Sequence, residues 1–240
     1  MQSSLYVALS AQVALQDRLD TLAQNVANGN TAGYRGNEVK FDSVLSSLSR
    51  EPVSFVASST PIVRLTGGAL VKTGNALDVA VKGNGWLSVE SPQGPVYTRD
   101  GRMQMNAAGS LISVNGAPLL DPGGTPIQLD ASGGEPTISA DGSISQGGKR
   151  TGTLGLFNLP SDAKLTRGEG GFTSSVPATN VVDFSANGVA QGFVEQSNVN
   201  PITEITRLVY VQRAFEGVNA AVQSAETSFK NAIQTLGSST

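Results

Sequence analysis

Residues 200–237 read NPITEITRLVYVQRAFEGVNAAVQSAETSFKNAIQTLG, and this pattern predicts one long helix. Asn200 and Pro201 suit the N-cap and the first turn of a helix, because Asn can accept hydrogen bonds from free backbone N–H groups and Pro has no N–H to lose. Beyond them, apolar residues alternate steps of three and four, which is the seam of a coiled coil. The seam consists of Leu208, Val211, Phe215, Val218, Val222, Phe229 and Leu236. We expect residues 201–240 to form a C-terminal helix that closes at Gly237.

The first 36 residues repeat this pattern. No Gly or Pro occurs before Gly29, and the Gly- and Asn-rich residues 28–33 are typical of a helix C-terminus. The same three-four spacing predicts a helix that contributes the other half of the seam. Its seam residues are Leu5, Leu15, Leu19, Leu22 and Val26.

Residues 75–174 have the features of a β domain. Leu77, Val79 and Val81 alternate with Asp, Ala and Lys, which predicts a half-buried strand. Further short apolar runs lie between Gly-, Pro- and Asn-containing turns, at residues 86–89, 96–98, 111–112, 127–129 and 153–157. The fold class we expect is α+β, with an antiparallel, barrel- or sandwich-like central domain and terminal helices that pair as a coiled coil. Residues 37–74 and 175–200 are expected to be connectors, the first of them extended.

Composition excludes several kinds of site. The 240 residues include no Cys and no His, so the chain has no thiolate nucleophile, zinc-thiolate site, disulfide or imidazole base. We expect no catalytic residue, no cofactor and no metal. The net charge of −3 and the even spread of Lys and Arg argue against nucleic acid as a partner.

Hydropathy predicts neither membrane insertion nor a cleaved signal peptide. No run of 18 apolar residues exists, and the N-terminus has no basic segment before its apolar residues. These rules alone indicate a cytosolic protein.

The length of the helices points to assembly. Residues 208–236 span about 44 Å as a helix, which is more than a small β domain easily covers. Even if the two helices pair, apolar flanks stay uncovered at Leu9, Val13, Ile202, Ile205 and Val209. Repeated head-to-tail contacts through such flanks generate an open helical assembly. We expect the ends to be disordered in the free chain and to order on assembly; the alternative is that the stripes are ordinary core.

Several motifs resemble those of flagellar basal-body rod proteins, in the same order along nearly the whole chain. They are NVANGNTAGYR at 25–35, GNALDVAVKGNGW at 74–86, YTRDG at 97–101, NAAGSL at 106–111, SNVN at 197–200 and QRAFE at 212–216. The first motif carries the family residues Asn25, Asn28, Thr31, Gly33 and Tyr34, with Ala32 where the family usually has Pro. The motifs favour the proximal-rod type; the alternatives within the family are a distal-rod or a hook-type subunit.

This resemblance implies a structural subunit of the axial drive shaft that serves motility, with its terminal helices in an inner tube and its β domain outside. It implies export by the flagellar type III apparatus without a cleaved signal, with Leu5 to Leu9 contributing to recognition, and assembly in the periplasmic basal body. Implied partners are self-copies, the distal-rod protein FlgG, the proximal rod subunits and the export apparatus.

Two other classes stay open at this point. Asp100, Asp121, Asp130 and Asp141 include candidates for a carboxylate pair of a glycosidase that acts on peptidoglycan, although each is placed in a turn where it can cap the backbone. The second class is a periplasmic binding module whose β domain is the receptor. The glycine-rich segments at 83–88 and 147–151 deviate from nucleotide-binding patterns and are better interpreted as turns.

Overall fold

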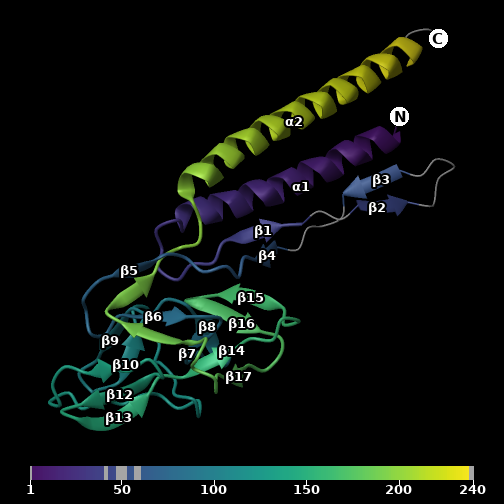
Figure 1. The fold of residues 1–240 in the computed structure, drawn as a ribbon. Coiled ribbons are helices and arrows are strands. Elements are labelled where there is room, and N and C mark those ends of the chain that lie inside the picture. Colours follow the sequence, from purple (N-terminus) through teal and green to yellow (C-terminus); the bar gives the residue numbers. More distant parts are fainter. Residues whose placement is uncertain (1, 41–42, 47–52, 57–60, 238–240) are drawn as a thin grey trace. The chain divides into compact units, whose positions relative to one another are not determined.

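The computed structural model describes residues 2–40, 43–46, 53–56 and 61–237 as an α+β protein with a helix near each end of the chain (Figure 1). The chain divides into two compact units. The helix unit comprises residues 1–28, 36–64 and 199–240, and the β unit comprises residues 29–35 and 65–198.

The helix unit contains helices α1 (Gln2–Ala27) and α2 (Pro201–Gly237). They run antiparallel beside each other (Figure 1). The unit also contains two antiparallel strand pairs: β1 (Asn37–Val39) with β4 (Pro61–Val63), and β2 (Ser43–Ser46) with β3 (Val53–Val56). The predicted N-cap of α2 is confirmed, because the Asn200 side-chain oxygen accepts hydrogen bonds from the N–H groups of Ile202 and Thr203 at 3.1 and 3.3 Å.

In the β unit every described strand pair is antiparallel. Six strands form the largest sheet, in the order β15-β16-β8-β7-β14-β17, and the others form sheets of two or three: β11-β12-β13, β10-β9, β18-β6 and β19-β5. The strands are β5 (Leu70–Lys72), β6 (Val79–Lys82), β7 (Trp86–Val89), β8 (Val96–Thr98), β9 (Met103–Met105), β10 (Leu111–Ser113), β11 (Thr137–Ile138), β12 (Ser143–Gln146), β13 (Lys149–Thr153), β14 (Leu156–Asn158), β15 (Leu165–Gly168), β16 (Gly171–Ser174), β17 (Thr179–Asn180), β18 (Gly188–Gln191) and β19 (Phe193–Glu195).

One hydrophobic core holds the β unit together. Side chains from most of its sheets meet there, and Leu87, Leu111 and Ile144 are fully buried at its centre. Burying apolar area of this kind stabilises a fold by roughly 1.5–3 kcal/mol per large side chain.

Three details differ from the sequence-based expectations. The antiparallel β domain is confirmed but is not a closed barrel, because the largest described sheet ends in two unjoined edge strands, β15 and β17. Strand β6 is buried on both faces rather than one, since Ala80 is as inaccessible as Val79 and Val81. Residues 127–129 form no described strand, although Gln128 bridges to Ser110 and the backbone of Ile127 and Leu129 hydrogen-bonds to neighbouring segments.

Candidate assembly surface

Most of the seam residues predicted from the sequence are buried or half-buried on α1 and α2. Leu22 and Val211 are buried. Seven further seam residues are half-buried: Leu15, Leu19, Val26, Leu208, Phe215, Val218 and Val222. Leu236 is 74% exposed, and the side chains of Leu5 and Phe229 lie outside the described residues. The helix pair therefore buries its seam at Leu22 and Val211 and leaves it open toward the end of α2.

Large apolar side chains are also exposed outside the seam. All five flank residues named from the sequence are at least 40% accessible: Leu9, Val13, Ile202, Ile205 and Val209. Tyr210 and Ile233 join them at 68% and 70% exposure. The sequence analysis missed both residues because they fall between heptad positions. Ile202, Ile205 and Val209 are three and four residues apart, so they lie on one side of α2, and an exposed apolar stripe of this kind is typical of a protein–protein interface.

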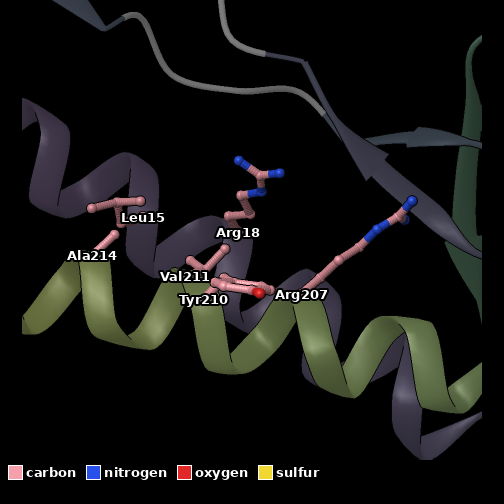
Figure 2. A pocket seen from close by; sticks show the side chains of 6 residues that line it. All are labelled: Leu15, Arg18, Arg207, Tyr210, Val211 and Ala214. Carbon is pink, nitrogen blue, oxygen red and sulfur yellow. The ribbon is translucent and has the colours of Figure 1, made fainter.

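A hollow lies between the two helices, and it is lined by side chains from both (Figure 2). Leu15, Val211 and Ala214 give it an apolar surface, and Arg18, Arg207 and Tyr210 complete the lining. The hollow thus combines apolar contact area with two cations. Arg207 is already paired with the buried Glu204 at 2.9 Å.

Asn25 holds the junction between the two helices and strand β1. Its side chain is fully buried, and its amide nitrogen donates to the Asn37 carbonyl at 2.9 Å while its oxygen accepts from the Asn37 N–H at 2.9 Å. The same nitrogen lies 3.4 Å from a carboxylate oxygen of Glu204 on α2. Glu204 is buried too and pairs with Arg64 at 3.2 Å and with Arg207 at 2.9 Å. This network fixes where the two helices approach each other.

The other family-motif residues shape the chain after α1. The Asn28 N–H and side-chain amide both donate to the Gln24 carbonyl, at 3.1 and 2.9 Å, and so close the helix. Thr31 is exposed, and its carbonyl accepts from the Tyr34 N–H at 3.3 Å in a turn. Gly33 has a φ of 66° and donates its N–H to the Glu195 carbonyl at 2.7 Å. A side chain at position 33 would start 2.2 Å from a backbone nitrogen, so only glycine fits.

Arg167 couples Tyr34 to the aromatic cluster of the β unit. Its guanidinium carbon lies 4.3 Å from the centre of the Tyr34 ring and 4.6 Å from that of Phe172. The Phe172 ring meets Trp86 edge-on at 5.7 Å, and the guanidinium of Arg99 lies 5.1 Å from the Trp86 ring. Cation–π contacts contribute from about 0.5 kcal/mol at exposed sites to about 2 kcal/mol where the cation is desolvated, as Arg99 is.

A buried ion triad lies next to this cluster. The Glu195 carboxylate pairs with Arg35 at 2.7 Å and with Arg99 at 3.2 Å, and all three side chains are nearly inaccessible. Burial lowers the pKa of the Arg99 guanidinium to about 10, while the charge of Glu195 opposes that shift. Glu195 was not singled out from the sequence, because a lone Glu in a polar segment carries no signal of burial. The triad ties the family motif to strand β19 in the β unit.

The four carboxylates considered for hydrolysis each belong to a local structure. Asp100 pairs with Arg102 at 2.7 Å. The other three accept hydrogen bonds within their own turns: Asp121 from Gly123 and Thr125, Asp130 from Ser132 and Asp141 from Ser143. These contacts match the capping interpretation of the sequence.

Comparison with known proteins covers nearly the whole chain. Residues 5–35 match the flagella basal body rod protein family, residues 80–146 match the flagellar hook protein FlgE/F/G D1 domain, and residues 190–235 match the flagellar basal body rod FlgEFG protein C-terminal family. The chain is 48% identical to the flagellar basal-body rod protein FlgF of Mesorhizobium japonicum, across 99% of both chains, and 45% identical to FlgF of Rhizobium meliloti, across 100% of both. It is 30% identical to the rod protein FlgG of Agrobacterium fabrum, over 93% of this chain and 95% of that protein. Within the described residues, neither helix is apolar over a stretch long enough to cross a membrane.

Proposed function

The chain belongs to the flagellar basal-body rod protein family, and from this premise we propose that it is a structural subunit of the bacterial flagellar rod. Its similarity to FlgF over the full length supports the proximal-rod type rather than the FlgG type. The observation that carries the assembly role is the helix pair, which buries Leu22 and Val211 but leaves Ile202, Ile233 and Leu236 at least 70% exposed.

An exposed apolar surface of this kind is expected for a subunit whose helices are covered by neighbouring subunits. Exposing large apolar residues costs about 1.5–3 kcal/mol each relative to burial, so contact between subunits stabilises both. We infer that α1 and α2 pair as a coiled coil in the rod and that neighbouring subunits cover the exposed flanks. The partners we propose are self-copies, FlgG-type and proximal rod subunits, and the export apparatus that delivers the chain to the periplasm without a cleaved signal. In this role the protein performs no catalysis.

Charge placed in the helix seam tests the assembly role. We expect Leu22→Asp to block incorporation into rods and abolish motility, because it puts a carboxylate into the buried contact between α1 and α2. Phe229→Asp, at the other end of the predicted seam, is expected to do the same. Gln24→Asp is the matched control, since it adds the same charge at an exposed position of α1.

The readouts are motility of cells that carry the variant as their sole copy, and the amount of the subunit in isolated basal bodies. Trp86, the only tryptophan, reports through its fluorescence whether the β unit stays folded. Normal motility of both seam variants would refute the assembly role.

Amide hydrogen exchange tests how ordered the two terminal helices are in the free subunit. We propose that the helices of the free subunit are less ordered than the β unit, so their amides exchange faster. From the sequence this expectation covered residues 1–36 and 201–240. Because residues 29–35 belong to the β unit, we now place the first boundary at residue 28. Protection of α1 and α2 equal to that of β6 and β7 would contradict the proposal.

A further inference from the structure

The chain passes between its two units four times, after residues 28, 35, 64 and 198. Within the β unit these four connections belong to three short segments, residues 29–35, 65–69 and 195–198, which we call the connection segments. All three segments are parts of the β unit, so the contacts among them lie inside one compact body.

Residues 195–198 hydrogen-bond to both of the other connection segments. The Gly33 N–H donates to the Glu195 carbonyl at 2.7 Å, and the Gln196 N–H donates to the Ala69 carbonyl at 2.8 Å. Two further bonds join the same segments, from the Asn198 N–H to the Tyr34 carbonyl at 3.2 Å and from the Asn198 side-chain amide to the Thr66 carbonyl at 2.8 Å. The three segments are therefore bonded to one another.

The Glu195 carboxylate is common to all three segments. One of its oxygens pairs with Arg35 at 2.7 Å and accepts a hydrogen bond from the Gly68 N–H at 2.9 Å. Its other oxygen pairs with Arg99 at 3.2 Å, and Arg99 also donates to the Gly83 carbonyl at 2.7 Å, directly after strand β6. Hydrogen bonds to an ionised acceptor are the strong ones. The carboxylate thus joins the connection segments to one another and to the strands of the β unit.

Apolar burial contributes little to holding the connection segments. The structure describes all their residues, and Tyr34 is the only buried apolar side chain among them. Leu65, Thr66, Gly67 and Ala69 are exposed. Regions with few buried apolar contacts open at a lower free energy than a hydrophobic core does.

The polar contacts of these segments should also break together. If one segment moves away, water reaches the Glu195 carboxylate. Its remaining charge pairs then weaken, because two charges attract each other much less in water than in the protein interior. The loss of one contact therefore favours the loss of the others.

We propose that Glu195 is a positioning residue that clamps the three connection segments into one cooperative unit, which opens as a whole and separately from the hydrophobic core. A pull on any one of the four connections is then resisted by the contacts of all three segments. The clamp is a property of the single chain and does not depend on the proposed rod function. It adds to that function, because a subunit of a shaft transmits force along its chain.

Amide hydrogen exchange of the full-length protein, followed by NMR at low urea concentrations, tests the clamp without any substitution. The amides that donate hydrogen bonds within the clamp are those of Gly33, Gly68, Gln196 and Asn198. After correction for intrinsic rates, these four should be protected to the same degree within about twofold and share one urea dependence. The core amides of Leu119 and Ile127 should be protected at least about tenfold more. Unrelated protection of the four clamp amides would contradict the proposal.

Two neighbouring glycines provide a matched pair of variants. A side chain at position 68 would start 1.9 Å from the Gln196 carbonyl oxygen, whereas one at position 67 meets nothing closer than 3.5 Å. Gly68→Ala should therefore speed exchange of the Gly33 amide, which lies on a different segment, by about tenfold or more. Gly67→Ala should change that rate by less than about twofold, and neither variant should affect Leu119.

Asn198→Ala is a milder variant, for use if Gly68→Ala does not fold. It removes the hydrogen bond to the Thr66 carbonyl and should speed exchange of the same clamp amides.

Two results with these variants would overturn the clamp. An unchanged rate at Gly33 would mean that the connection segments open independently of one another. An equal increase at Leu119 would mean that they do not open separately from the core. Neither result affects the rod function, which fails separately if Leu22→Asp leaves motility normal.

Discussion

The β unit and the helix unit differ in how completely each buries its own apolar residues. The β unit closes a continuous core around Leu87, Leu111 and Ile144. The described side chains of α1 and α2 include only three buried apolar residues, Ala14, Leu22 and Val211, while eight large ones are exposed on the same two helices: Leu9, Val13, Ile202, Ile205, Val209, Tyr210, Ile233 and Leu236. The β unit closes a core within a single chain even though Leu65, Leu70, Val71, Val114, Val182 and Phe184 are exposed, whereas the two helices expose more large apolar side chains than they bury.

The buried charged side chains also differ between the two units. In the β unit, Glu195 pairs with both Arg35 and Arg99 inside the domain. In the helix unit, the buried Glu204 is paired with Arg207, which is itself half exposed and lines the hollow. A rigid domain that carries an incompletely covered helix pair suits a subunit that must be stable alone and still polymerise.

Removing the charge of Glu195 should have the largest effect on the β unit. Glu195→Gln leaves Arg35 and Arg99 buried without a counter-charge, which should lower the free energy of unfolding by about 3–5 kcal/mol. Urea unfolding followed by Trp86 fluorescence measures this, because both arginines lie within 6 Å of that ring. Glu169→Gln, at an exposed position, is the control. A loss below 1 kcal/mol would show that the triad is not what holds this part of the domain.

Truncating apolar side chains compares the two units directly. Leu111→Ala should cost about 2–5 kcal/mol, because it opens a cavity in a fully buried site. Ile233→Ala should change the stability of the free chain by less than about 0.5 kcal/mol, since its side chain is already in water. Both are measured by urea unfolding, the second also by helix content from circular dichroism. Similar losses in the free energy of unfolding for the two variants would contradict the difference that we describe between the two units.

Two glycine substitutions should give a smaller difference. Gly33→Ala and Gly116→Ala both place a side chain at positive φ, which costs about 1 kcal/mol. Only at position 33 does the new carbon also meet backbone atoms, at 2.2 and 2.3 Å, whereas nothing lies within 4 Å of position 116. We expect Gly33→Ala to lower the unfolding midpoint in urea clearly more than Gly116→Ala. Equal shifts would mean that residues 29–35 are not held tightly against residues 99 and 100.

Acid should have the smallest effect, and it should act on the turns of the β unit. Hydrogen bonds from the Ser143 hydroxyl and backbone hold the pKa of Asp141 below its usual range, and Ser132 and Ser185 act likewise on the pKa values of Asp130 and Asp183. A lowered folded-state pKa stabilises the fold above the unfolded value of about 3.9, and this stabilisation is lost as pH falls through the folded-state pKa.

With no histidine in the chain, unfolding midpoints in urea should stay flat from about pH 5 to pH 8 and decline below about pH 4. Ser143→Ala should reduce the decrease of the unfolding midpoint that occurs below about pH 4. A decline that begins at pH 6 would show that another group controls the acid response.

The sequence indicated the helices and the family well, because both depend on local rules. The three-four spacing from Leu208 onward and the cap at Asn200 predicted α2 from its first residue. The glycine- and asparagine-rich residues after Ala27 predicted the end of α1. Turn residues likewise separated most of the short strands. The three-four spacing alone also predicted the exposed flank residues, because it shows which side chains lie on the same face of a helix.

Periodicity did not determine how far each surface is covered. Ile233 and Tyr210 were missed because they fall between the heptad positions, and the spacing does not show what lies opposite a side chain in the folded chain. The pairing of β1 with β4, inside a segment expected to be a connector, joins residues that are far apart in sequence.

The two helices, the antiparallel β character of the middle of the chain and the family could be predicted from the sequence alone, because capping, turn chemistry and heptad spacing act between residues that are near in the chain. Three features are visible only in the folded chain. Glu195 lies between Arg35 and Arg99, Gly33 contacts the backbone of Asp100, and Leu15 and Ala214 line one hollow. Each of these contacts joins distant segments. Its strength comes from the exclusion of water around it, which is a property of the folded molecule and not of any stretch of sequence.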